Sequence, residues 1–537
     1  MASKISRRNQ SIHSIHHFED MPSENNHSEI HSGINSKKIF EKICRFLPYL
    51  GISFLLMLLL TRSSFLYPYN NWDDSNSYFS MGKSMFHGAL IYRDLFDQKG
   101  PYLYFLYGLC SLISRTTFLG VFCMEVLLGA IDLVLLVRIM RLWCRPRTAF
   151  VFSPVLFACM CASKSFYWGG CAEEICLPFL LLPLYLLLKT LHSEEKPSFL
   201  PKTVFAAGLC CGFVFCVKFT LMGFFLGFAI IVILTCRSFR EFLRLAGWFL
   251  LGVLLPFVPW LIYFALTGGL DDWYRVYIYT NVFLYSDFGA NSHGASAAQK
   301  LYDLAKLLYW LIRDNFQYFL FVLLGIIWTL FRRTASFAER IAPLLLFALT
   351  FFFIYIGGAH LPYYAFPLTS FAVIGMAFVG WLWDIPADRP GQRKNASLLI
   401  ALAFSFLVIL RRSWNMDYLG TPKDQIFLTR FTQDINDDRQ AGLVDPEHTT
   451  LLNLGCLDSG LYTTADIYPT CYWFQTQTLP GDEVTTQQLS YIQEARTDYI
   501  VARDSYPDEI FDHYELIDTF HQSLQPQDFD YYLFRRK

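Results

Sequence analysis

Long apolar runs separated by short polar segments occupy most of the chain. Most of these runs approach the roughly 20 residues that an α-helix needs to cross the hydrocarbon core of a bilayer. The sequence therefore predicts eleven membrane-spanning helices, preceded by a disordered cytoplasmic tail at residues 1–46. The predicted spans are 47–66, 117–138, 148–164, 175–191, 203–218, 221–236, 246–267, 315–331, 341–357, 364–383 and 396–411.

The positions of lysine and arginine predict the orientation of these spans. Every second connection is basic, as cytoplasmic loops of membrane proteins usually are. The pattern predicts a multi-pass plasma-membrane protein with a cytoplasmic N-terminus and an extracytoplasmic C-terminus. The basic residues used are Lys37, Lys38, Lys42, Arg45, Arg138, Arg141, Arg145, Arg147, Lys189, Lys196, Lys202, Arg237, Arg240, Arg244, Arg332, Arg333, Arg340, Arg389, Arg393 and Lys394.

Two outer loops, 67–116 and 268–314, are long enough to carry structure. Pro101–Ser114 in the first is apolar but short, and if it crossed the membrane every later basic loop would face outward. We therefore expect an interfacial or re-entrant helix there. Aromatic residues in the second loop indicate a helix lying in the membrane interface, namely Trp273, Tyr274, Tyr277, Tyr279 and Tyr285.

The segment 412–537 has a different pattern, with short apolar strands and one amphipathic helix at Gln487–Arg496. The fold class is thus an all-α polytopic membrane domain at 47–411 followed by a small extracytoplasmic α/β domain. Cys456 and Cys471 are the only cysteines of that domain, and both a disulfide and two separate thiols remain open. The predicted strands are Thr449–Leu454, Tyr499–Ala502, Tyr514–Phe520 and Asp530–Phe534.

The composition agrees with a membrane protein, because 54% of the residues are hydrophobic and only 17% are charged. Soluble domains are usually about a quarter charged. The net charge of −1 does not identify a partner. Membrane lipids are expected to surround the protein, and no nucleic-acid partner is expected.

The first outer loop holds the strongest candidates for chemistry. Asp73 and Asp74 stand beside aromatic residues, and Asp97 and Lys99 precede a Gly-Pro turn. A carboxylate near the bilayer can serve as a general base for a hydroxyl acceptor, and a lysine there can hold a lipid phosphate. The alternative is that the two aspartates only cap a helix at residues 75–87.

Further polar groups are expected at the same level of the membrane. Glu173 and Glu174 follow two glycines at the start of a span, where they either complement the helix dipole or face the first pair of acids across a cleft. The other groups at the outer ends of spans are Lys218, His360, Tyr363 and Tyr364.

The first outer loop resembles that of the membrane-embedded glycosyltransferases of the GT-C superfamily. The closest branch contains the protein O-mannosyltransferases and the aminoarabinose transferases of lipid A, a family 39-like group. Gly100 stands where that branch usually has the first proline of a Lys-Pro-Pro turn. The matching residues are Asp73, Asp74, Tyr78, Gly88, Tyr92, Arg93, Asp94, Phe96, Asp97, Gln98, Lys99, Pro101 and Tyr104.

The resemblance implies a polyprenyl-phosphate sugar donor and an extracytoplasmic acceptor, which is a cell-wall polymer, a lipid or a protein. It implies that Asp74 activates the acceptor, with Asp73, Glu173 or Glu174 as further carboxylates. Lys99 and Asp97 correspond to the donor-phosphate site, and Lys218, Tyr363 and Tyr364 are its further candidates. The cofactor stays undefined. A divalent metal is one option, with Asp97 and His360 as candidate ligands.

A transporter and a membrane scaffold are the two alternatives to a glycosyltransferase. A polysaccharide or lipid transporter, or flippase, would be expected to show repeated halves with broken helices, and no repeat relates 47–236 to 246–411. A membrane scaffold that only displays the C-terminal domain would leave the acids of the outer loops unexplained.

Overall fold

The structure is a computed structural model. It describes residues 25–193, 197–284, 296–358, 360–385, 396–477, 479, 482–524 and 527–537. The chain divides into two units, Met1–Pro48 and Tyr49–Lys537, and every site discussed here lies in the second.

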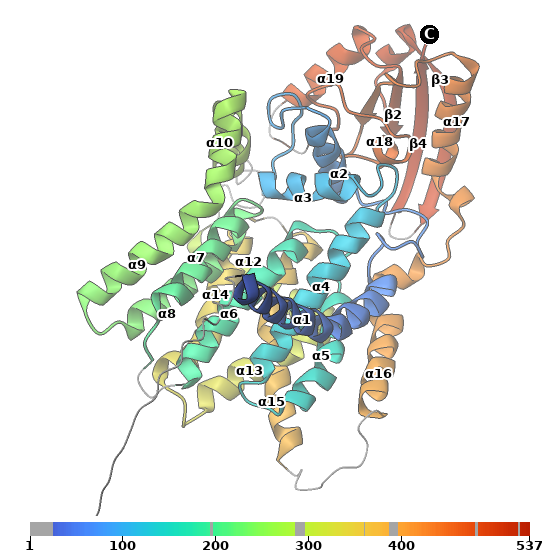
Figure 1. The fold of residues 1–537 in the computed structure, drawn as a ribbon. Coiled ribbons are helices and arrows are strands. Elements are labelled where there is room, and N and C mark those ends of the chain that lie inside the picture. The colour runs from blue at the N-terminus through green and yellow to red at the C-terminus, as the bar shows by residue number, and fades with distance from the viewer. Residues whose placement is uncertain are drawn as a thin grey trace, which may run out of the picture. The chain divides into compact units, whose positions relative to one another are not determined.

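Up to Arg412, every described element of secondary structure is a helix (Figure 1). The outer loop after the first helix forms α2 (Asp73–Phe86) and α3 (Pro101–Ser111). The remaining helices are α1 (Asn25–Leu60), α4 (Leu119–Met140), α5 (Pro146–Cys161), α6 (Ala172–Ser193), α7 (Pro201–Phe215), η1 (Phe219–Leu221), α8 (Met222–Thr235), α9 (Phe239–Leu254), η2 (Leu255–Phe257), α10 (Val258–Thr267), α11 (Leu270–Trp273), the π-helix η3 (Tyr274–Leu284), α12 (Ala297–Asp314), α13 (Phe316–Phe331), α14 (Phe337–Tyr355), η5 (Pro362–Phe371), α15 (Ala372–Asp384) and α16 (Ala396–Arg412).

Among the described residues, six helices are long and apolar enough to cross a membrane, and a seventh span results if α12 and α13, which meet at a 115° bend, count as one. The predicted spans at 148–164, 203–218 and 221–236 instead appear as the shorter apolar helices α5, α7 and η1–α8. Prolines begin α5 and α7, and a 3-10 turn begins the third. A multi-helix apolar fold is therefore confirmed, while the number of eleven spans stays a prediction.

Several predictions fall at the edges of the described chain. Helix α1 begins at Asn25, so residues 25–46, predicted as part of a disordered tail, are helical. Residues 1–24 lie outside the described residues, as do Tyr285 in the second outer loop and the basic residues Lys196, Arg389, Arg393 and Lys394.

The predicted interfacial helix of the first outer loop is α3, which has 11 residues and is too short to cross a bilayer. It packs closely against α2 because two glycines meet: a Cβ added at Gly82 would lie 2.5 Å from the backbone nitrogen of Gly108. The pair of glycines therefore fixes how α2 lies on α3.

The C-terminal domain contains a four-stranded sheet in the order β1-β2-β4-β3. Strand β1 (Leu451–Leu454) runs parallel to β2 (Tyr499–Arg503), and β4 (Gln527–Arg536) pairs antiparallel with both β2 and β3 (Tyr514–Leu524). All four strands occur where the sequence predicted them, and the predicted helix is present too. The helical segments are η6 (Trp414–Asp417), η7 (Lys423–Gln425), α17 (Phe427–Ala441), α18 (Leu461–Thr464), α19 (Glu483–Gln493) and η8 (Asp508–Asp512).

Cys456 and Cys471 are both buried free thiols in the structure. The disulfide that the sequence left open is therefore not formed between them, and the domain depends on its own hydrophobic core and hydrogen bonds.

One polar face of α2 is bound to this C-terminal domain. The hydroxyl of Ser77 donates to Gln475 at 2.6 Å, and that of Ser80 donates to Asp458 at 2.5 Å. One turn further on, the ammonium of Lys83 donates to the carbonyl of Tyr462 at 3.0 Å. Residues three and four apart share one face of a helix, so α2 has α3 on one side and the C-terminal domain on another (Figure 1).

We predict that the first outer loop and the C-terminal domain lie on the opposite side of the membrane from the 141–147 connection. In intact cells, a membrane-impermeant maleimide should label the variants Arg93→Cys and Glu509→Cys. It should label Arg141→Cys only after the cells are permeabilised. All three positions are exposed, and the protein without an added cysteine gives the background. Labelling of Arg141→Cys in intact cells would contradict the predicted orientation.

Candidate active site

A cavity of about 380 Å³ lies where the outer ends of the helices meet the C-terminal domain. Five separate parts of the chain build its wall: the start of α2, the segment before α3, the turn before α6, the start of η5 and the C-terminal domain. The lining residues are Trp72, Asp73, Asp74, Asp97, Gln98, Lys99, Tyr167, Trp168, Leu361, Pro362, Tyr363, Tyr364, Leu457, Gln477, Arg503 and Phe529.

Asp74 is held by a neutral donor. The hydroxyl of Tyr363, from η5, donates to Oδ2 of Asp74 at 2.6 Å. The Tyr363 ring meets the ring of Trp72 at 4.9 Å and that of Tyr167 at 5.8 Å between centroids. The aromatic contacts fix the phenol, and the phenol in turn fixes the orientation of the partly exposed carboxylate.

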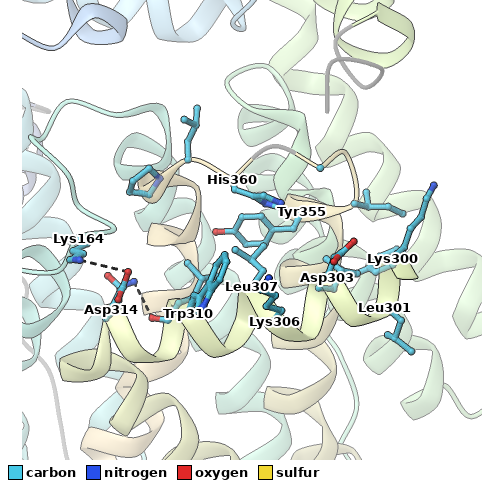
Figure 2. A pocket seen from close by; sticks show the side chains of 18 of the residues that line it. Lys164, Lys300, Leu301, Asp303, Lys306, Leu307, Trp310, Asp314, Tyr355 and His360 are labelled. Carbon is cyan, nitrogen blue, oxygen red and sulfur yellow. Dashed lines mark hydrogen bonds and ion pairs between the residues drawn. The ribbon is translucent and has the colours of Figure 1, made fainter. Parts of the chain in front are cut away.

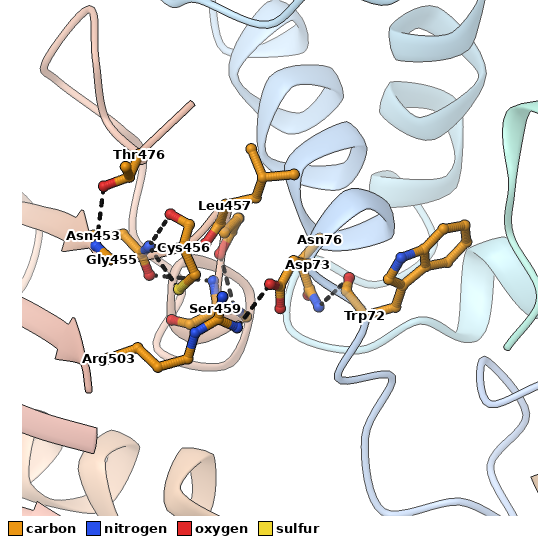
Figure 3. A network of polar contacts seen from close by, with 12 residues as sticks. Trp72, Asp73, Asn76, Asn453, Gly455, Cys456, Leu457, Ser459, Thr476 and Arg503 are labelled. Atoms are coloured by element: carbon orange, nitrogen blue, oxygen red, sulfur yellow. Dashed lines mark hydrogen bonds and ion pairs between the residues drawn. The ribbon is translucent and has the colours of Figure 1, made fainter. Parts of the chain in front are cut away.

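Asp73, the neighbour of Asp74, is held by a charged donor. Arg503, at the end of β2, donates to Oδ2 of Asp73 at 2.8 Å (Figure 3). The guanidinium also lies over the ring of Phe529, 4.5 Å from its centroid. Burial raises the pKa of Asp73 to about 6, although the nearby guanidinium acts to lower it. The first turn of α2 therefore presents two carboxylates with different partners.

A loop after β1 brings Leu457 to the cavity wall, and Asn453 shapes that loop. The amide of Asn453 donates to the carbonyl oxygens of Cys456 at 2.9 Å and Leu457 at 2.8 Å (Figure 3). Gly455 has φ of +79°, and a Cβ there would lie 2.5 Å from the carbonyl oxygen of Arg503. Only glycine fits this close approach, which also places the Arg503 backbone.

The loop before α3 carries one aspartate, Asp97, and one lysine, Lys99. Asp97 is buried, its Oδ1 accepts from the backbone N–H of Gln98 at 2.8 Å, and burial raises its pKa. Lys99 is fixed through its backbone, because its N–H donates to the Tyr104 hydroxyl at 2.8 Å and its carbonyl accepts from Tyr92 at 2.6 Å. The ammonium of the half-buried Lys99 side chain lies 5.9 Å from the centroid of the Tyr78 ring.

Lys218 and Glu173 form a buried ion pair next to this cavity. The ammonium of Lys218 also lies over the ring of Tyr364, 3.8 Å from its centroid. Neither member of the pair belongs to the described cavity lining. The pair thus supports Tyr364, one of the lining residues, from behind.

Glu174, the next residue along α6, has a different place. Its Oε2 accepts from the backbone N–H of Gly170 at 2.9 Å. Nearby, Glu125 of α4 accepts from the Thr61 hydroxyl at 2.8 and 2.9 Å. Glu174 is therefore part of a buried group that holds the turn before α6, and it does not line the cavity.

The structure brings together six of the residues selected from the sequence, Asp73, Asp74, Asp97, Lys99, Tyr363 and Tyr364. It places Glu173 and Lys218 behind them and Glu174 apart from them. It also bears on the capping explanation of the aspartates, because no side-chain cap hydrogen bond is present among the described residues at the start of α2. They occupy the first turn of α2, where acids suit the helix dipole, but Arg503 and Tyr363 are their side-chain partners, which capping alone does not explain.

The sequence did not identify the contribution of the C-terminal domain. Arg503, Phe529, Leu457 and Gln477 all line the cavity. An arginine at the end of an otherwise apolar strand was the one available signal, and it does not say which acid it pairs with.

A second cavity, of about 820 Å³, adjoins the first (Figure 2). It lies along α12, and the two cavities share Leu361 and Pro362 in their walls. Leucine, isoleucine and aromatic side chains line most of it, with lysines that include Lys164 and Lys306. The Tyr355 hydroxyl, buried in its wall, has no hydrogen-bond partner within the described part of the chain.

The candidate metal ligands do not come together. Asp97 lines the smaller cavity, whereas His360 lines the larger one. Within the described ranges, no group of three histidine, cysteine, aspartate or glutamate side chains is arranged to hold a metal ion. Asp97 and His360 therefore do not share a metal site in the described part of the chain.

The Asp73–Arg503 pair yields a stability prediction. Arg503→Ala should lower the free energy of unfolding more than the double change with Asp73→Asn does, because the single change leaves a partly buried carboxylate without its cation. The coupling free energy between Asp73 and Arg503 should be about 1–3 kcal/mol. Since the pKa of Asp73 is raised to about 6, folding gains stability as this carboxyl takes up a proton. The cost of Arg503→Ala should therefore shrink as the pH falls through that value.

Thermal unfolding of the single and double variants across this pH range would measure the effect. Asp73→Asn alone completes the set. Losses in the two single variants that add up to the loss in the double variant at every pH would show that the pair is not coupled.

Comparisons with known proteins agree with this architecture. No family model matches the sequence, and no curated protein matches it. A crystal structure of ArnT from Cupriavidus metallidurans bound to undecaprenyl phosphate aligns over 92% of this chain and 98% of its own, with 13% identity and a TM-score of 0.56. The apo state of that protein aligns over 93% and 98%, with 12% identity and a TM-score of 0.54.

A cryo-EM structure of the arabinofuranosyltransferase AftD from Mycobacteria aligns over 91% of this chain and 41% of its own, with 13% identity and a TM-score of 0.48. The fold expected from the first outer loop is confirmed by the alignment with ArnT: the chain has a GT-C-type fold.

Proposed function

We propose that this protein is a glycosyltransferase that moves a sugar from a polyprenyl-phosphate donor to a hydroxyl group of an extracytoplasmic acceptor. The observation that carries the proposal is the smaller cavity, where three aspartates and a lysine meet beside the mostly apolar larger cavity. The alignment with ArnT, whose structure contains undecaprenyl phosphate, supports the choice of a lipid-linked donor.

Asp74 is the proposed general base. The acceptor oxygen attacks the anomeric carbon of the sugar, its proton passes to Asp74, and the bond between that carbon and the phosphate oxygen breaks. Tyr363 holds one carboxylate oxygen of Asp74 by a hydrogen bond from a neutral hydroxyl, which orients the carboxylate. The polyprenyl phosphate leaves with the electron pair of the broken bond.

Lys99 is the proposed partner of the donor phosphate. It lines the same cavity as Asp74 and sits on a turn that Tyr92 and Tyr104 fix through its backbone. A lysine ammonium is a compact charge that holds a phosphate without demanding one geometry. It would stabilise the negative charge that grows on the leaving phosphate.

The larger cavity is the proposed place for the lipid part of the donor. Its walls are mostly apolar, and it reaches Leu361 and Pro362 at the border of the smaller cavity. A lipid lying there would bring its phosphate to Lys99 at that border. The acceptor would then approach from the side of the C-terminal domain, where Arg503 and Phe529 lie.

The function itself is tested with purified protein, a polyprenyl-phosphate sugar and an extract of the cell envelope. Release of polyprenyl phosphate together with a newly glycosylated product is expected. Profiling of lipid-linked sugars and envelope glycans in a deletion strain would identify the product. Lipid binding without sugar transfer to any fraction would favour a transporter instead.

The first prediction from this mechanism concerns Asp74. Asp74→Asn should reduce transfer by about 10²–10⁴-fold, because the amide cannot accept the proton of the acceptor. Donor binding and the thermal unfolding midpoint should stay close to those of the unchanged protein. The measurements are single-turnover transfer, donor affinity and thermal unfolding.

Asp94→Asn is the matched control for Asp74→Asn. Asp94 lies in the same outer loop but is exposed and does not belong to the described cavity lining. It should keep its activity. Near-normal turnover in Asp74→Asn would remove this residue from the mechanism and direct attention to Asp73.

The second prediction concerns Lys99. Lys99→Ala should weaken binding of the polyprenyl-phosphate sugar while leaving the fold intact, because the side chain is only half buried. The expected loss of donor affinity is about tenfold or more, which corresponds to one charge-assisted contact. Lys99→Arg should restore part of the affinity. Unchanged donor affinity in Lys99→Ala, measured in detergent, would exclude this role.

A further inference from the structure

A third cavity, of about 410 Å³, lies at the other end of α2 from Asp73 and Asp74. We call it the basic cavity. Its lining residues are Lys83, Phe86, His87, Ser111, Leu112, Ile113, Ser114, Arg115 and Tyr468. Among the described residues that line it, two are cationic, one is a histidine and none is acidic.

The two cations of this cavity face a carboxylate of the C-terminal domain. Lys83 and Arg115 share one carboxylate, that of Asp466, at 3.3 and 3.1 Å. The side chain of Lys83 is only 1% exposed, so its ammonium is a built part of the wall, whereas the Arg115 side chain is 61% exposed. His87 stacks on Tyr468 with 4.0 Å between ring centroids, which holds the imidazole at the rim.

Apolar side chains next to these cations point to the membrane. Leu112 is 69% exposed and Ile113 is 57% exposed, directly after the end of α3. A few residues later the apolar helix α4 begins at Leu119, and Leu119 and Leu127 are exposed on it. Because α4 is long enough to cross the bilayer, this segment belongs at the level where the headgroups meet the acyl chains.

We propose that the basic cavity binds the phosphate of an anionic phospholipid of the outer leaflet, with Leu112 and Ile113 inserted among its acyl chains. Arg115 offers a planar pair of N–H donors that matches two phosphate oxygens. Lys83 and His87 complete the surroundings of the phosphate. Zwitterionic lipids fit less well, because their own cation would meet Arg115.

Such a lipid would join two parts of the protein. Lys83 and His87 belong to the end of α2, whereas Asp466 and Tyr468 belong to the C-terminal domain. A phosphate bound between them adds a contact across the same junction that Ser77 and Ser80 form nearer the aspartates. Binding is therefore expected to raise the thermal unfolding midpoint of the whole chain.

The test uses the full-length protein in nanodiscs of phosphatidylcholine, with and without phosphatidylglycerol, and counts bound lipid by native mass spectrometry after extraction. Phosphatidylglycerol should bind and raise the unfolding midpoint. Arg115→Gln should weaken its binding about fivefold, the effect of about one cation at a membrane surface. His87→Gln in addition should weaken it further.

Arg93→Gln is a matched control. Arg93 is another exposed arginine of the first outer loop, also paired to a carboxylate at 3.1 Å, but it does not line the basic cavity. Equal losses in Arg93→Gln and Arg115→Gln would reduce the effect to general surface charge and overturn the proposal. So would an absence of phosphatidylglycerol binding. Inorganic phosphate that binds and stabilises as well as the lipid would overturn a lipid site in favour of a free anion.

Discussion

The structure depends on the way in which helix α2 is bound on its polar face. Ser77, Ser80 and Lys83 attach it to the C-terminal domain, and the Gly82–Gly108 contact lets it lie directly against α3. Buried hydroxyls and ammonium groups are costly unless they find partners. The helix therefore has one position in which these polar groups all have partners. That position fixes where its first turn enters the cavity.

This arrangement makes the C-terminal domain a part of the site. Arg503 and Phe529 enter the cavity from β2 and β4, which pair in the sheet. A domain that only covered the membrane helices would not need its own strand end beside Asp73. The site is built at the junction, where the apolar larger cavity leads to a polar wall that the membrane helices alone do not provide.

The sequence predicted the local elements well. The strands at 449–454 and 499–502, the helix after Asp74 and the short apolar helix at 101–114 all have counterparts, because alternation, helical spacing and length are local properties. The shorter helices α5, α7 and α8 show the limit of such patterns, since apolar length alone does not tell a full span from a partial one.

The sequence did not predict which side chains pair with each other. Tyr363 is 289 residues from Asp74, and Arg503 is 430 residues from Asp73. Nothing in a local pattern chooses between two adjacent acids, or says that Lys218 pairs with Glu173. One signal was present and was not used, namely the polar residues at helical spacing along α2. A polar stripe on a helix that cannot face lipid indicates a docking surface.

The two aspartates at the start of α2 have partners that differ in charge, and the roles proposed for them follow from that difference. The guanidinium of Arg503 pairs with Asp73, so that this carboxylate anchors the C-terminal domain. The phenol of Tyr363 orients Asp74 without cancelling its charge. Proteins can give two identical groups a structural and a chemical task by placing them in different environments. The sequence favoured Asp74 over Asp73 as the base, and the neutral partner of the Asp74 carboxylate supports that proposal.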